Sequence, residues 1–169
     1  MNNADPESQS LIAQLLLLVV LTFINAFLAA AEIAVVSVNK NRVEQKAEDG
    51  DAKAQKLLKV LQDPNNFLST IQVGITLVNI LSGASLAETL SSRLAPVLGG
   101  GAAAKSLASI IILALLTYVS IVFGELYPKR IAMNKSEEVA QLTSGAVRFL
   151  GVIARPFVWL LSASTDLLS

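Results

Sequence analysis

The chain has no cysteine and no histidine, and only 15% of its 169 residues are charged. The lack of cysteine excludes disulfides and thiolate metal sites. The lack of histidine removes the commonest general base and the usual zinc ligand, so serine–histidine and cysteine–histidine catalysis are excluded. The formal net charge is zero, which gives no indication of nucleic-acid binding. These absences argue against an enzyme and against a nucleic-acid-binding protein.

Apolar residues dominate what remains, at 53% of the chain with a mean hydropathy of +0.60. A helix needs about 20 apolar residues to cross a bilayer. Three runs reach that length, at residues 11–38, 67–90 and 107–127. Pro96 and the glycines after it end the second run, and Pro128 predicts a kink or an end in the third. We therefore expect an all-α membrane protein with three transmembrane helices in a single domain, residues 1–169.

Lysine and arginine are unevenly distributed between these runs. None precedes Lys40, six lie between the first two runs, and two lie between the second and the third. Because cytoplasmic loops carry the excess of basic residues, we expect the N-terminus outside and the C-terminus inside, in the cell (inner) membrane. The basic segment 39–65 is helix-prone, and Gly50 predicts that it forms two short cytoplasmic helices.

The tail, residues 137–168, is long enough for a fourth span but carries Arg148 and Arg155. Each arginine would cost about 2.5–3.5 kcal/mol at a helix centre, which cancels most of the apolar gain. The two arginines are seven residues apart and share a face, and apolar residues form another face. This pattern favours an amphipathic juxtamembrane helix at the cytoplasmic interface, with a fourth span as the alternative.

Polar side chains recur along the apolar runs at helical spacing. Glu32 and Glu125 are acidic residues near hydrocarbon, where a carboxylate is usually kept for an ion path or a partner. The second run carries a stripe made of Ser69, Gln72, Thr76 and Asn79. Further polar or small faces comprise Asn25, Ala29 and Glu32 in the first run and Thr117, Ser120 and Gly124 in the third. Carboxylate, amide and hydroxyl oxygens are the ligands of hard cations such as Mg²⁺.

Two structural interpretations compete with an ion site. Intramembrane serine, threonine, asparagine and glutamine often hydrogen-bond neighbouring helices, with a gain of about 0.6–2 kcal/mol each. The carboxylates could also form ion pairs, Glu125 with Lys129 four residues on, or Glu32 with a cytoplasmic lysine or arginine. Small-residue faces and the limited enclosure given by three helices favour a homodimer in the lipid bilayer.

Three motifs, in this order, carry a family resemblance: FLAAAEIAVVSV, NNFLSTIQVGITLVNILSG and VFGELYPKRIA. With a basic helical segment between the first two, they resemble the membrane domain of the CNNM/CorC family. The resemblance implies dimeric Mg²⁺ transporters, generally credited with efflux, with Na⁺ as a candidate coupling ion. It also implies a cytoplasmic CBS-domain pair, which is absent from these 169 residues.

The resemblance also implies ligands. The glutamate of the GExxPK element is Glu125, directly after Gly124, and the asparagine of the second span best matches Asn79. A serine expected three residues before Glu32 is replaced by Ala29, and a second polar ligand is replaced by Ile75. Backbone carbonyls, water, or Ser69, Gln72 and Thr76 would have to compensate. The leading interpretation is a Mg²⁺ transporter; the alternative is a membrane anchor or sensor for a regulatory CBS module.

Overall fold

The computed structural model describes residues 6–169, with side chains described for 11–82 and 87–169. Its long helices are α1 (Pro6–Ser37), α4 (Pro64–Leu94), α5 (Ala102–Ile121) and α7 (Ser136–Leu168). The shorter helices are α2 (Lys40–Glu48), α3 (Ala52–Gln62), the 3₁₀ helix η1 (Ala95–Leu98), the π-helical turn η2 (Val122–Leu126) and α6 (Tyr127–Asn134). No strand occurs between residues 6 and 169, so the expected all-α class is confirmed.

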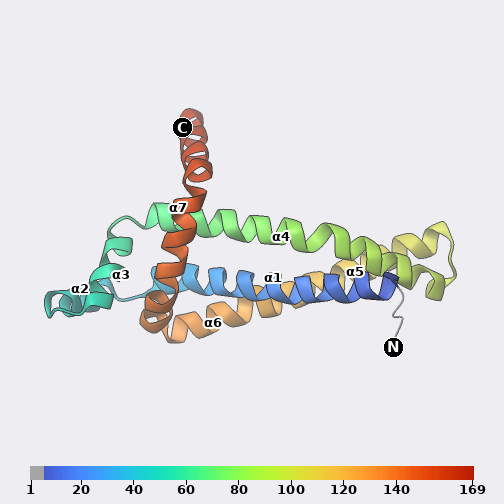
Figure 1. Ribbon diagram of the computed structural model, residues 1–169, viewed down its shortest axis with the longest axis horizontal. Helices are drawn as coiled ribbons and strands as arrows, with labels where there is room; N and C mark the ends of the chain where they lie inside the picture. The colour runs from blue at the N-terminus through green and yellow to red at the C-terminus, as the bar shows by residue number, and fades with distance from the viewer. Residues whose placement is uncertain (1–5) are drawn as a thin grey trace.

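The helices α1, α4 and α5 lie side by side along the long axis of the molecule (Figure 1). The helices α2 and α3 pack at one end of this bundle, and α7 runs crosswise over α1 and α4 near the same end (Figure 1). Four helical stretches are long and apolar enough to cross a membrane, at Leu11–Ser37, Pro64–Leu98, Ala102–Asn134 and Ser136–Leu168. The membrane-helix architecture is thus supported, whereas the division into three spans and one interfacial helix is not confirmed.

Two chain breaks were anticipated from the sequence. Gly50 separates α2 from α3 with a φ of 96°, a left-handed conformation that glycine adopts without steric cost. Pro96 lies in η1, after the end of α4, and Gly99 and Gly100 follow it with positive φ. At Pro128 the outcome differs from a simple end, because the helical path continues from α5 through η2 into α6. The wider π-helical turn accommodates the proline there.

The packed core lies at the end of the bundle where α2, α3 and α7 meet the long helices. One cluster joins α1, α3, α4 and α7 through Leu28, Ala31, Val35, Val60, Phe67, Ile71 and Val147. A second cluster joins α1, α2, α3, α6 and α7 through small residues and Leu57. Leu28 sits against Gly74 so closely that a Cβ there would lie 2.8 Å from Leu28 Cδ1. Much of the remaining apolar surface of the long helices is exposed and suits contact with lipid.

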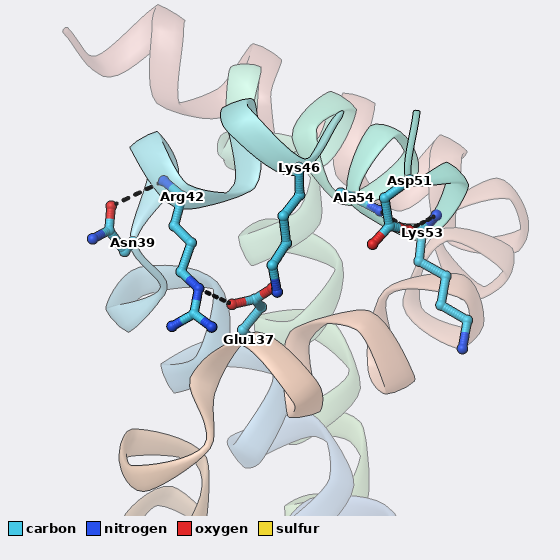
Figure 2. Close-up of polar contacts among 7 residues, drawn as sticks. All are labelled: Asn39, Arg42, Lys46, Asp51, Lys53, Ala54 and Glu137. Carbon is cyan, nitrogen blue, oxygen red and sulfur yellow. Dashed lines mark hydrogen bonds and ion pairs between the residues drawn. The ribbon is translucent and has the colours of Figure 1, made fainter. Parts of the chain in front are cut away.

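Polar contacts attach the short helices to α7. Figure 2 shows Glu137, in the first turn of α7, between Arg42 and Lys46 of α2. The Arg42 Nε to Glu137 Oε2 distance is 3.3 Å, and Lys46 Nζ donates a hydrogen bond to Glu137 Oε1. Side chains also cap both short helices, with Asn39 accepting from Arg42 N at 3.3 Å and Asp51 from Lys53 N at 3.0 Å (Figure 2). These contacts hold α2 against the start of α7.

We expect Glu137→Gln to destabilise the protein by about 1–2 kcal/mol, because it removes a charge-assisted hydrogen bond to Lys46 while the exposed Arg42 pair contributes little. The Glu137 side chain is only 18% exposed. Thermal unfolding in detergent measures the change. Glu138→Gln is the matched control, since Glu138 is exposed and in none of the ion pairs of the described residues. Equal unfolding temperatures for the two variants would contradict the assignment.

Candidate functional site

The candidate site begins at the backbone carbonyl of Gly124, to which Pro128 cannot donate the α-helical hydrogen bond. In an α-helix the carbonyl of residue 124 accepts from the N–H of residue 128, and proline has no N–H. The Gly124 oxygen instead accepts a hydrogen bond from Asn25 Nδ2 of α1, at 3.0 Å. A Cβ at position 124 would lie 3.0 Å from Asn25 Nδ2, so glycine allows this close approach. The π-helical turn and α1 are thereby held in register.

This hydrogen bond also determines the orientation of the Asn25 amide. A carbonyl oxygen can only accept, so Nδ2 must face Gly124 and Oδ1 must point elsewhere. Asn25 is 4% exposed, and its Oδ1 is buried with no hydrogen-bond partner among the described residues. A buried carbonyl oxygen without a donor is unfavourable by about 1–3 kcal/mol. Asn25 therefore offers an oxygen that a cation could use.

A small cavity of about 10 Å³ lies between α1, α4 and the end of α5. This volume is at the lower limit for one water molecule. The polar residues that line it are Thr22, Asn25, Asn79, Ser82, Ser120 and Gly124, and Leu21 and Val78 complete the wall. Ser82 Oγ donates to the Val78 carbonyl at 2.7 Å, which leaves its lone pairs available as ligands. All the polar side-chain ligands here are oxygens, which hard cations prefer.

Glu125 follows Gly124 in the π-helical turn and is half-buried. Glu125 does not line the small cavity, but the preceding residue, Gly124, does. Its carboxylate has no hydrogen bond or ion pair within the described part of the chain. Glu125 is therefore an unneutralised acidic group next to a cluster of neutral oxygen ligands.

Glu32 forms an ion pair with Lys129, with Oε2 3.7 Å from Nζ. The sequence left open whether Glu125 pairs with Lys129 or Glu32 pairs with a cytoplasmic basic residue. The structure shows the Glu32 pair, and Glu125 is not part of it. Glu32 is seven residues from Asn25 on α1, which places it about 10 Å along the helix from the cavity. Glu32 thus lies two turns from the cavity, where it links α1 to α6.

The rest of the predicted set does not gather at the cavity. Gln72 Nε2 donates to Thr76 Oγ1 at 3.4 Å, and both residues are exposed. Ser69 is half-buried one turn before Gln72, and Ala29 is fully buried in helix packing. Asn79 and Gly124 are the two predicted residues that line the cavity. Side chains described here form no group of three or more acidic, histidine or cysteine residues suited to a metal.

Four polar lining residues were not in the predicted ligand set: Thr22, Asn25, Ser82 and Ser120. The sequence contains features that could have indicated two of them. Asn25 is an amide inside a long apolar run, four residues before Ala29. Ser120 stands four residues before Gly124, on the same helix face. The sequence did not reveal that Asn25 lies beside the π-helical turn. The resemblance placed the ligand of this helix one turn later, at the position of Ala29.

Comparison with known proteins identifies the family. The family model described as "Cyclin M transmembrane N-terminal domain" (CNNM) matches residues 16–169. The chain belongs to this family. Family membership rests on nearly the full length of the chain, including both sides of the cavity. The family is one of membrane domains of transporter type rather than of enzymes.

Relatives extend the comparison. The chain is 40% identical over 94% of its length to UPF0053 protein sll0260 of Synechocystis, covering 36% of that protein. It is 33% identical to UPF0053 inner membrane protein YfjD of Escherichia coli, over 86% of this chain and 32% of the relative. It is 32% identical to a "Polyamine export protein" of Haemophilus influenzae, over 86% of this chain and 34% of the relative. The chain thus spans about a third of the length of these relatives.

Proposed function

We propose that this chain is the membrane domain of a divalent-cation transporter with Mg²⁺ as its cargo. The observation that carries the proposal is the buried Asn25 Oδ1, which has no partner and belongs to a cavity lined by oxygen ligands. The proposed direction is efflux and the proposed coupling ion is Na⁺, as the family resemblance implies. The proposed location is the inner membrane, which the printed name of the E. coli relative supports.

The chemistry of the lining suits a dehydrated hard cation. Mg²⁺ takes six oxygen ligands at about 2.1 Å and gives up its water reluctantly, so a neutral pocket alone would not hold it. Asn25, Asn79, Ser82, Ser120 and the Gly124 carbonyl supply neutral oxygens. Glu125 would supply the negative charge that offsets dehydration. Asn25 would also stand in for the serine expected at the position of Ala29, one turn closer to the start of α1.

A polyamine is the second candidate cargo, because a relative of 32% identity is named a polyamine export protein. A polyamine is a long cation whose ammonium groups also need carboxylate and oxygen partners. A cavity of about 10 Å³ favours a bare metal ion over such an extended ligand. Efflux of Mg²⁺ and of a polyamine from proteoliposomes containing this chain distinguishes the two cargoes.

We expect Glu125→Gln to abolish the stabilisation that Mg²⁺ gives to the detergent-solubilised protein. The substitution keeps the shape of the side chain and removes its charge. Asn79→Leu should weaken the same stabilisation by roughly tenfold or more in Mg²⁺ concentration, the loss expected for one ligand worth at least about 1.4 kcal/mol. Asn79 is preferred over Asn25 for this test, because Asn25 also holds the Gly124 carbonyl. Thermal unfolding over a Mg²⁺ titration measures both effects.

Glu88→Gln is the control for the loss of one carboxylate, since Glu88 is exposed on α4 and lines neither cavity. Its Mg²⁺ response should equal that of the wild type. Full Mg²⁺ stabilisation of Glu125→Gln would exclude the assignment. A normal response of Asn79→Leu alone would reduce Asn79 to a helix-packing residue.

The position of α7 in the membrane is also a proposal. If α1, α4 and α5 cross the bilayer along their common axis, a helix that runs across α1 and α4 lies in the membrane plane (Figure 1). Its side chains support this orientation. One face packs on the protein through Ala140, Thr143 and Val147, while Leu142, Phe149 and Ile153 are exposed and can enter the acyl layer. We propose that α7 is an interfacial helix on the cytoplasmic side.

A cysteine at Ser169 should therefore react with impermeant thiol reagents from the cytoplasmic side only, as should a cysteine at Asp49. The chain has no natural cysteine, so each variant has one reporter. Inside-out and right-side-out vesicles give the two accessibilities. Labelling of S169C from outside together with D49C from inside would demonstrate a fourth span.

We expect a homodimer, because three spans enclose little space and the partly exposed Ala26 and Ala30 of α1 allow close packing between copies. Native mass spectrometry in mild detergent should give the mass of two chains. Monomers alone, at concentrations where Mg²⁺ still stabilises the protein, would contradict a dimeric transporter.

A further inference from the structure

A much larger groove lies away from the candidate ion site, where α7 crosses the end of α3 and the start of α4. Its volume is about 580 Å³, within the range of small-molecule sites. Figure 1 shows that the C-terminal half of α7 extends beyond α4. The groove belongs to the end of the molecule that carries the short helices α2 and α3.

The floor of the groove is apolar and its edge is charged. Phe67, Val147 and Val158 line the floor and are 6%, 1% and 7% exposed. Trp159 lies at the edge with 70% of its surface exposed. Tryptophan is enriched at the membrane–water interface, where its ring contacts acyl chains and its N–H reaches the headgroups. The lining therefore combines a surface for hydrocarbon with one for a polar group.

The charge at the edge is positive and unneutralised. Lys59, Arg148 and Arg155 face a single carboxylate, Asp63, which leaves a net charge of +2 around the groove. None of these four residues is in an ion pair of the described chain. At the start of α7, by contrast, Glu137 pairs with Arg42 and Lys46 of α2. The cations of the groove, unlike Arg42 and Lys46, are in no ion pair within the described residues.

The two arginines of the groove lie on one face of α7. Arg148 and Arg155 are seven residues apart, so they lie on one face of α7, on either side of Gly151. A Cβ at Gly151 would lie 3.3 Å from Thr70 Oγ1, so the absence of a side chain there lets α7 approach α4 closely. Guanidinium groups bind phosphate through paired hydrogen bonds, which Lys59 can supplement as a point charge.

We infer that this groove binds the phosphate headgroup of an anionic phospholipid from the cytoplasmic leaflet. The inference rests on the interfacial position of α7 proposed above, and not on the ion cargo. A lipid fits better than free phosphate, because the apolar floor and the exposed Phe157, Leu160 and Leu161 of the same helix give acyl chains a surface. The bound headgroup would supply the counter-charge for Lys59, Arg148 and Arg155.

The test compares lipids on the delipidated chain in a zwitterionic detergent without Mg²⁺. Dioleoyl-phosphatidylglycerol should raise the unfolding temperature and remain bound in native mass spectra, and dioleoyl-phosphatidylcholine should do neither. Arg148→Gln with Arg155→Gln should weaken phosphatidylglycerol binding by roughly thirtyfold, about fivefold for each cation near an anionic headgroup. Both arginines are exposed, so the double variant should fold normally.

Two further double variants separate groove charge from general charge. Arg148→Lys with Arg155→Lys keeps the cations and should retain most of the affinity. Lys105→Gln with Arg130→Gln removes two exposed cations outside the groove and should bind phosphatidylglycerol like the wild type.

Equal loss in the Lys105/Arg130 control, or no loss in the Arg148/Arg155 glutamine variant, would overturn the site. Equal binding of phosphatidylcholine would show that the headgroup charge is not recognised. Stabilisation by sodium phosphate alone, at matched ionic strength, would show a site for free phosphate and overturn the lipid assignment. Because no ion gradient is used, these outcomes are independent of whether the chain carries Mg²⁺.

Discussion

The hydrogen bond from Asn25 to the Gly124 carbonyl is the contact on which the centre of the molecule depends. Backbone groups in hydrocarbon must find partners within the protein, and Pro128 has no N–H to donate the α-helical hydrogen bond to this carbonyl. Asn25 supplies the donor from another helix at 3.0 Å. The same contact sets the register of α1 against the π-helical turn and leaves Asn25 Oδ1 buried and unpaired. The Asn25 side chain therefore holds two helices together through Nδ2 and offers a candidate ligand oxygen through Oδ1.

The charged residues near the membrane-length helices fall into two sets, those paired with a residue of another helix and those without a partner in the described chain. Glu32 and Glu137 are each matched by a basic residue from another helix, which ties α1 to α6 and α2 to α7. Glu125 is half-buried beside the small cavity and has no such partner within the described chain. Arg148 and Arg155 are similarly unmatched at the groove. An unpaired charge near hydrocarbon is costly, so an external counter-charge is the physical expectation in both places.

The packed core explains how these sites are held. Small residues such as Ala34, Ala132 and Ala140 are fully buried where α1, α6 and α7 meet. Small side chains permit close helix approach, which in lipid replaces the hydrophobic driving force of soluble proteins. The core is concentrated at the end that carries α2, α3 and the crossing of α7, while the bundle beyond it exposes apolar side chains. The rigid end thus supports the groove and the base of the π-helical turn.

The sequence alone determined the features that follow from composition and local chemistry. Apolar length predicted the helices, Gly50 predicted the break between α2 and α3, and the motifs around Glu125 predicted the family. It also selected Asn79 and Gly124, because polar groups on apolar helices are identifiable one residue at a time. The partners of those groups depend on helix register, which local patterns do not encode.

Because helix register is not encoded locally, only the tertiary structure decided which side chains meet. Only the packing of α1 against the π-helical turn brings Asn25, one turn before Ala29, to Gly124 and to the small cavity. Only the approach of α6 to α1 pairs Lys129 with Glu32 rather than with Glu125. The crossing of α7 likewise brings Arg148 and Arg155 to one groove with Lys59, which is far from them in sequence. Each of these depends on distances between helices, and a rotation or shift by one residue would bring different side chains together.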